Sequence, residues 1–116
     1  SLFSCIPQMN FSAKRSLLIL LSNVFNENIL EKEERLELAR SGFIQVISDF
    51  MSDMGIENHV DDVICFMKTM LSSFEEFPDM VNSVDFDSFC FEDFKSVDED
   101  LDTIIYAICD IINEKS

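Results

Sequence analysis

The chain has few of the residues that turn a backbone sharply, with two glycines and two prolines among its 116 residues. An all-β protein of many short strands needs such residues at its turns, so their scarcity predicts a mainly helical domain. Cations are also few: eight lysines and arginines face 23 aspartates and glutamates, which gives a formal net charge of -15. Because that charge would repel a phosphate backbone, nucleic acid is not an expected ligand.

Long hydrophobic runs and close cysteine pairs are missing as well. Unbroken apolar runs such as 17–21 are much too short to span a bilayer, and no segment resembling a signal peptide opens the sequence. The cysteines lie far apart in apolar stretches, without the spacing of a zinc site or the density of a disulfide scaffold: Cys5, Cys65, Cys90 and Cys109. We therefore expect an intracellular protein, cytoplasmic or nuclear, with reduced cysteines and no membrane contact.

Apolar residues are abundant, at 47% of the chain. That share is enough for a packed core, unlike the composition of a disordered acidic tail, and the length suits one domain. We therefore expect residues 1–116 to form a single helical domain. The chain opens with Ser1-Leu2-Phe3 and no initiator methionine, which is typical of a fragment of a longer protein.

Apolar residues recur every three or four positions along most of the chain, which is the spacing of one helix face. The pattern predicts helices over 13–26, 29–40, 43–54, about 60–77 and about 97–115. The first of these is apolar over most of its surface, so it should have neighbours on several sides. The charged run 31–35 indicates a solvated face on the second helix.

Polar residues and glycines mark the expected helix ends. The predicted N-caps are Ser12, Asn28 with Glu31, Asn58, and Ser96 with Glu99. Gly42 and Gly55 are predicted to separate the second, third and fourth helices. The segment 78–97 is harder to interpret, because its phenylalanines mix helical with alternating spacing; we predict it to be helical.

Three apolar segments resemble one another at a regular distance. Residues 19–24, 65–70 and 106–111 share a bulky or apolar first position, a polar fifth position and an apolar sixth position. They are 46 and 41 residues apart, within the period of roughly 40 to 47 residues of armadillo and HEAT helical repeats. This periodicity predicts a helical repeat array.

Two segments resemble the armadillo family. Residues 39–47 look like its short first helix turning at glycine into a second helix, and 21–24 look like the end of its third helix. The resemblance implies about two and a half repeats, with 29–74 as the complete one. It also implies a ladder of polar residues that grips an extended partner chain, here Asn23, Thr69 and Asp110. A compact all-α bundle is the alternative architecture.

No residue pattern indicates catalysis, a metal or a cofactor. Acids alternate over 98–102 as in an EF-hand loop, but Thr103 stands where the loop needs glycine and Cys109 where it needs glutamate. His59 is followed by two aspartates, which do not complete a zinc shell. Phosphate-binding loops and nucleophile elbows are also missing, so we expect a protein that is not an enzyme.

The charge indicates the partner. Residues 75–116 hold 13 acids with only Lys95 and Lys115, which gives -11 of the total -15. This half should attract a basic peptide or a basic amphipathic helix. The expected function is therefore that of a non-enzymatic adaptor or scaffold, and exposed end faces of a short array can also pair two copies into a homodimer.

Candidate partner-binding residues lie in the same half. Phe89 and Phe91 could anchor a partner helix, while Asp98, Glu99 and Asp100 select its charge. Packing of these phenylalanines in the core is the competing interpretation. The chain is also similar in size, acidity and helicity to viral Bcl-2-like proteins, which would imply sequestration of a host signalling factor.

Overall fold

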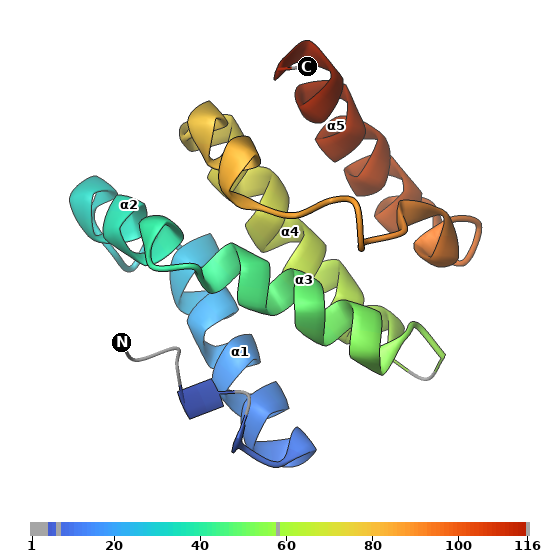
Figure 1. Ribbon diagram of the computed structural model, residues 1–116, viewed down its shortest axis with the longest axis horizontal. Coiled ribbons are helices and arrows are strands. Elements are labelled where there is room, and N and C mark those ends of the chain that lie inside the picture. Colours follow the sequence, from blue (N-terminus) through green and yellow to red (C-terminus); the bar gives the residue numbers. More distant parts are fainter. Residues whose placement is uncertain (1–4, 7, 58, 116) are drawn as a thin grey trace.

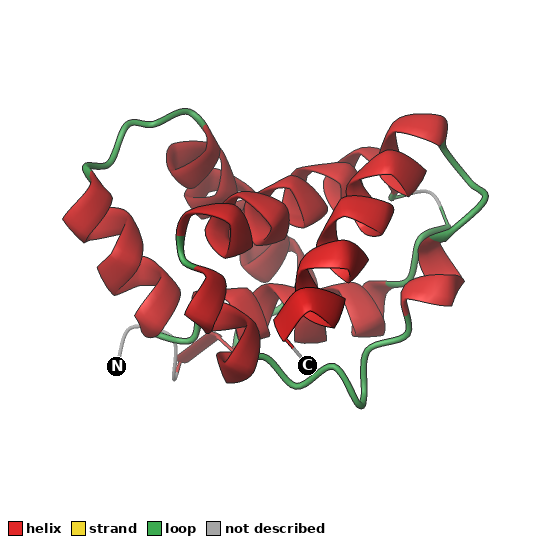
Figure 2. Ribbon diagram, turned by 90° about the horizontal axis from the view of Figure 1, so that it is seen from above, coloured by secondary structure: helices red, strands yellow, loops and turns green. Residues whose placement is uncertain are grey.

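The computed structural model describes residues 5–6, 8–57 and 59–115 (Figure 1). Its helices are α1 (Phe11–Asn26), α2 (Lys32–Arg40), α3 (Phe43–Met54), α4 (Val60–Glu76) and α5 (Glu99–Lys115), with 3-10 segments η2 (Pro78–Ser83) and η3 (Phe91–Phe94). The described residues contain no strand (Figure 2), so the predicted all-α class is confirmed. The radius of gyration is 13.3 Å, close to the value of about 13 Å expected for a compact chain of this length.

Helices α1, α4 and α5 lie side by side, with α4 between the other two (Figure 1). The rings of Phe11 and His59 are 5.9 Å apart at the beginnings of α1 and α4, and Asn26 at the end of α1 meets Thr69 in the second half of α4. The two helices are therefore parallel. Lys115 at the end of α5 pairs with Asp79, just beyond the end of α4, so α5 runs in the same direction.

Helix α1 begins two residues earlier than predicted because Asn10 caps it. Asn10 Oδ1 accepts a hydrogen bond from the backbone N–H of Ala13 at 2.9 Å, while Ser12 lies inside the first turn. This bond satisfies one of the free N–H groups at the helix start, so the assignment of Ser12 as the cap is wrong. Leu18 and Phe25 are the apolar residues that α1 buries.

Helix α2 begins at Lys32, later than predicted. Asn28 has φ 56°, a left-handed conformation that turns the chain and keeps 27–31 out of the helix. The backbone N–H of Glu31 donates to Glu34 Oε1 at 2.9 Å, so the cap is Glu31 with Glu34, and the predicted pair of Asn28 with Glu31 is wrong.

The predicted bounds of α3 are confirmed, and both glycines flank it. Gly42 has φ 96° and Gly55 has φ 71°, conformations that favour glycine over any residue with a Cβ. The change of direction at Gly42 lets α3 cross over α1 and α4 (Figure 1). Asn58, the predicted cap of α4, lies outside the described residues.

The predicted helix over 78–97 is instead two short 3-10 turns joined by a loop. Asp85 explains the break, because its carboxylate accepts from the backbone N–H of Asp87 and from the hydroxyl of Ser88, both at 2.9 Å. Its own N–H donates to Gln45 Oε1 of α3 at 2.7 Å. These local bonds replace the helical ones.

The start of α5 also differs from the prediction. Ser96 has φ 65° and is not the cap. Asp98 Oδ1 accepts from the N–H of Leu101 at 3.0 Å, and Asp102 accepts from the N–H of Ser96 at 2.8 Å. A carboxylate therefore caps the positive end of the helix, where its charge is stabilising.

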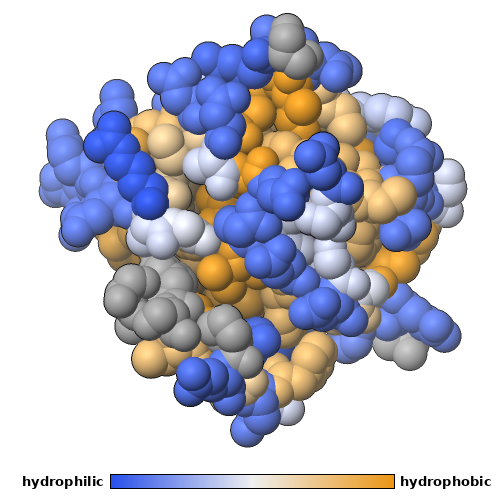
Figure 3. Space-filling model, viewed as in Figure 1, coloured by the Kyte–Doolittle hydropathy of each residue, from blue (hydrophilic) through white to orange (hydrophobic). Residues whose placement is uncertain are grey.

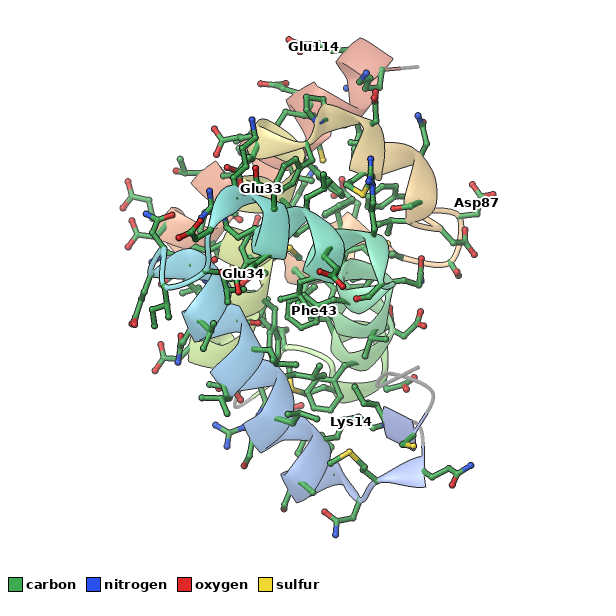
Figure 4. The ribbon with its side chains drawn as sticks, turned by 90° about the vertical axis from the view of Figure 1, so that its left-hand side faces the viewer. Lys14, Glu33, Glu34, Phe43, Asp87 and Glu114 are labelled. Carbon is green, nitrogen blue, oxygen red and sulfur yellow. The ribbon has the colours of Figure 1, made fainter. Side chains whose placement is uncertain are left out.

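The hydrophobic core lies where α3, α4 and α5 meet. Its fully buried large side chains include Phe43, Ile47, Met51, Phe66, Met67, Met70, Phe74, Leu101, Ile105 and Ile108. Burying one such side chain contributes about 1.5–3 kcal/mol, so this cluster is the main source of stability. Phe43 lies inside the molecule at the start of α3 (Figure 4).

Candidate protein-binding surfaces

The three residues predicted as polar rungs are not equally accessible. Asn23 on α1 and Asp110 on α5 are exposed, but Thr69 on α4 is fully buried. The Thr69 hydroxyl lies 3.1 Å from Asn26 Oδ1 and 3.1 Å from the carbonyl of Cys65. Thr69 therefore joins α1 to α4 and is not available to a partner.

The exposed residue of α4 next to Thr69 is Lys68. A shift of one residue moves a side chain by about 100° around a helix, which separates a buried position from an open one. Thr69 therefore does not stand in an exposed polar row with Asn23 and Asp110, and Lys68 is the exposed residue beside it.

Polar contacts join the first halves of α1 and α4. Arg15 Nε lies 2.6 Å from Asp62 Oδ2 and Arg15 Nη2 lies 3.0 Å from Asp62 Oδ1, a bidentate pair that raises the pKa of Arg15 through its hydrogen bonds and charge. His59 Nδ1 is 3.8 Å from the same carboxylate. Over the residues described, no cluster of three His, Cys, Asp or Glu side chains could hold a metal ion.

Cys65 is not placed as a nucleophile. Its sulfur lies 3.5 Å from Asn23 Oδ1, and burial, with the charge of Asp62 as a second cause, raises the pKa of its thiol. A raised pKa leaves little thiolate at neutral pH, and the thiolate is the reactive form. Burial likewise raises the pKa of Cys109 on α5.

The phenylalanines of the 84–97 loop form one stack. Phe89 is 6% exposed, and its ring lies parallel to Phe94 at 5.3 Å and edge-on to Phe91 at 4.8 Å. Phe86 connects this stack to Phe74 of α4 at 5.9 Å. Phe89 therefore packs in the core, and half-buried Phe91 keeps only part of its surface for a partner.

Of the three acids at the start of α5, one is committed to the fold. Asp98 is half-buried and caps the helix through the N–H of Leu101. Glu99 and Asp100 are exposed. Glu99 and Asp100 are thus the members of this group that can act on an approaching partner.

Both lysines of the acidic half are neutralised locally. Lys95 Nζ lies 2.7 Å from Glu92 and 5.3 Å from the ring centre of Tyr106, and Lys115 Nζ lies 2.9 Å from Asp79. The hydrogen bond and charge of Lys115 lower the pKa of Asp79, which therefore stays ionised. The remaining acids of 75–116 therefore give this segment a negative electrostatic potential.

A groove between α1 and α2 was not predicted as a site. It is lined by Leu21, Val24, Leu30, Glu34, Glu37, Leu38 and Ser41. Beside it, Leu20 is 59% exposed and Ile29 is 63% exposed. Glu34 lies where α2 passes the end of α1 (Figure 4). The signal in the sequence was the apolar surface of 13–26, which called for neighbours on several sides.

The surface elsewhere mixes both kinds of residue. Hydrophilic side chains cover much of the face in Figure 3, with hydrophobic side chains visible between them. In the part of the chain that the structure describes, no helix combines the length and the apolar character needed to cross a membrane.

No protein-family model, curated protein or solved structure matches this chain. The function must therefore be argued from the geometry and charge of the chain itself.

Proposed function

We propose that the chain is a non-enzymatic protein-protein interaction module, an adaptor or scaffold that binds a basic or amphipathic segment of another protein. The observation that carries the proposal is the unbalanced charge of 75–116. Both lysines of this segment are held by carboxylates, while acids such as Glu99 and Asp100 face solvent. Such a field speeds encounter with a cationic partner and disfavours acidic ones.

The proposed architecture is an armadillo-like array. In its support, α1, α4 and α5 are parallel and adjacent, and their similar segments are 46 and 41 residues apart. Short α2, the turn at Gly42, α3 and α4 would form one repeat of three helices. Of the predicted polar row, Asn23 and Asp110 face solvent.

A compact all-α bundle fits the described helices equally well. The alternative function is sequestration of a host signalling factor by a viral Bcl-2-like protein. The compact shape of the chain supports it. Both functions require a protein partner. The two architectures differ in whether the helical period continues in the sequence that flanks these residues, so the flanking sequence would distinguish them.

The test is the rate at which the chain associates with a basic amphipathic peptide. Reversing Glu99 and Asp100 to lysine should slow association and weaken its salt dependence, because both depend on the summed field. Asp98 is left unchanged, since its loss would uncap α5. The control reverses Asp53 and Glu57, two exposed acids outside the acidic half, for the same change in net charge.

We expect the α5 charge reversal to decrease the association rate clearly more than the control reversal does. Thermal unfolding should be unchanged in both variants. Equal rates for the α5 variant and the parent chain would contradict the proposal that this half recruits the partner. If the parent chain does not bind the peptide, the proposed function fails.

A further inference from the structure

The groove between α1 and α2 is an apolar surface with no covering element among the described residues. Its floor consists of Leu21 and Val24 from α1, Leu30 from the connecting loop and Leu38 from α2. Helix α4 packs against another side of α1, and Leu20 remains more exposed than covered. A helix with a wide apolar stripe normally has neighbours on more than one side.

The walls of the groove are held in place before any partner arrives. Arg35 Nη1 lies 2.5 Å from the carbonyl of Leu30, and the Arg35 guanidinium is fixed by two 2.7 Å contacts to Glu76 of α4. The loop before α2 is thus fastened to the central helix. The N–H of Glu31 holds Glu34 at the edge of the groove, so little ordering is needed on binding.

The charges at the groove are acidic. Glu34 and Glu37 line it, and no lysine or arginine does. The exposed cations of α2, Lys32 and Arg40, are outside the lining. A second copy would bring the same acids and a further charge of -15, so a second copy is disfavoured as the occupant.

We infer that the α1–α2 groove binds a basic amphipathic helix of a partner protein, an inference that rests on the proposed function. The apolar face of that helix would cover Leu21, Val24 and Leu38, as in other helix-in-groove contacts. Its lysines or arginines would lie beside Glu34 and Glu37. The acids of α5 then steer the partner from a distance, and the groove sets how long it stays.

The experiment uses a synthetic leucine-lysine peptide of about 18 residues, or about five helical turns, with one apolar face. A scrambled peptide of the same composition and charge has no such face. Affinities are measured for the parent chain and for Glu37→Lys, Val24→Thr and the control Asp53→Lys. Glu37 and Asp53 are both exposed acids on helices, and only Glu37 lines the groove.

We expect the amphipathic peptide to bind at least about tenfold more tightly than the scrambled one, and Glu37→Lys to weaken it about tenfold. Val24→Thr replaces a methyl group by a hydroxyl of similar size. It should speed dissociation, because the apolar contact is weakened while the shape of the groove is kept. Asp53→Lys should weaken binding by no more than about threefold, through the long-range field alone. Thermal unfolding of each variant confirms that the fold is intact.

Equal losses from Glu37→Lys and Asp53→Lys would overturn the inference and leave the proposed function standing, because the peptide would then bind elsewhere. The same holds if the scrambled peptide binds as tightly as the amphipathic one. A concentration-dependent dimer that Val24→Thr dissociates would assign the groove to a second copy, which also overturns it. No binding of either peptide would overturn the inference and the proposed function together.

Discussion

The central helix α4 has a parallel neighbour on each side, and the two contacts are built from different chemistry. Its contact with α1 carries polar links along its length, from Arg15 with Asp62 to Asn26 with Thr69. Its contact with α5 buries a stripe of aliphatic residues, Leu101, Ile104, Ile105 and Ile108, against the core.

The α4–α5 contact mainly supplies stability, whereas the α1–α4 contact fixes the position of one helix along the other. Aliphatic side chains supply most of the burial energy but tolerate small shifts along a helix. A bidentate ion pair or a buried hydroxyl requires one geometry, because a displaced partner leaves a polar group without a hydrogen bond. We therefore expect substitutions at the α4–α5 contact to cost more stability than those at the α1–α4 contact.

The largest effect is expected from Ile108→Asp. Ile108 is fully buried in the middle of the aliphatic stripe of α5. An unpaired carboxylate there should cost several kcal/mol, comparable to the whole stability of about 5–15 kcal/mol of a small domain. Circular dichroism should show an unfolded chain at room temperature. The control Tyr106→Asp, at an exposed position of the same helix, should melt nearly as the parent does.

A smaller loss is expected at the aromatic stack that closes the α4–α5 contact. Phe89→Ala should cost about 3 kcal/mol, because the ring is buried between Phe91 and Phe94. Phe91→Ala, at a half-buried position, should cost less than about 2 kcal/mol. Urea unfolding measures both. If Phe91→Ala instead leaves stability intact and speeds peptide dissociation, Phe91 is a partner anchor.

The α1–α4 contact is tested by Thr69→Val, which keeps the shape and removes the hydroxyl. Asn26 then loses a hydrogen-bond partner, so unfolding should become easier by about 1 kcal/mol. Thr69→Ser keeps the hydroxyl and serves as the control. A loss as large as that of Phe89→Ala would remove the distinction between the two contacts.

The smallest effect is a pH dependence at the end of α4. The hydrogen bonds from Arg35 are the main cause that lowers the pKa of Glu76. The unfolded chain therefore binds a proton more readily at this residue. The ion pair contributes fully above the ordinary glutamate pKa of about 4.3 and is lost as the pH falls through the lower folded value. Glu76→Gln should flatten the dependence of melting temperature on pH in the acid range and leave its high-pH side unchanged.

The long amphipathic helices could be predicted from the sequence, but the short 3-10 turns and the loop between α4 and α5 could not. The bounds of α3 follow from its stripe and from Gly42 and Gly55. The helix predicted over 78–97 is wrong because Phe86 and Phe89 pack from a loop, where the hydrogen bonds of Asp85 outweigh helical spacing. The predicted N-caps of α1, α2 and α5 are wrong by a few residues, because several polar side chains near each helix start could accept the capping hydrogen bond.

The candidate site was predicted only in part. Glu99 and Asp100 are exposed as the steering role requires. Thr69 occupies the polar position of the α4 segment that resembles 19–24 and 106–111, but in the structure this position is buried and contacts Asn26 of α1. The apolar surface of 13–26 indicated a further neighbour, but the position of the groove could not be predicted, since it depends on the loop before α2 and on where α2 lies.

The most direct measurement is a titration of the isotope-labelled chain with the basic amphipathic peptide, followed by backbone amide chemical shifts. We predict the largest changes at the groove residues Leu21, Val24 and Leu38, and small changes along α5. Shifts confined to α5, or no shifts at peptide concentrations that saturate a binding module of micromolar affinity, would contradict this prediction.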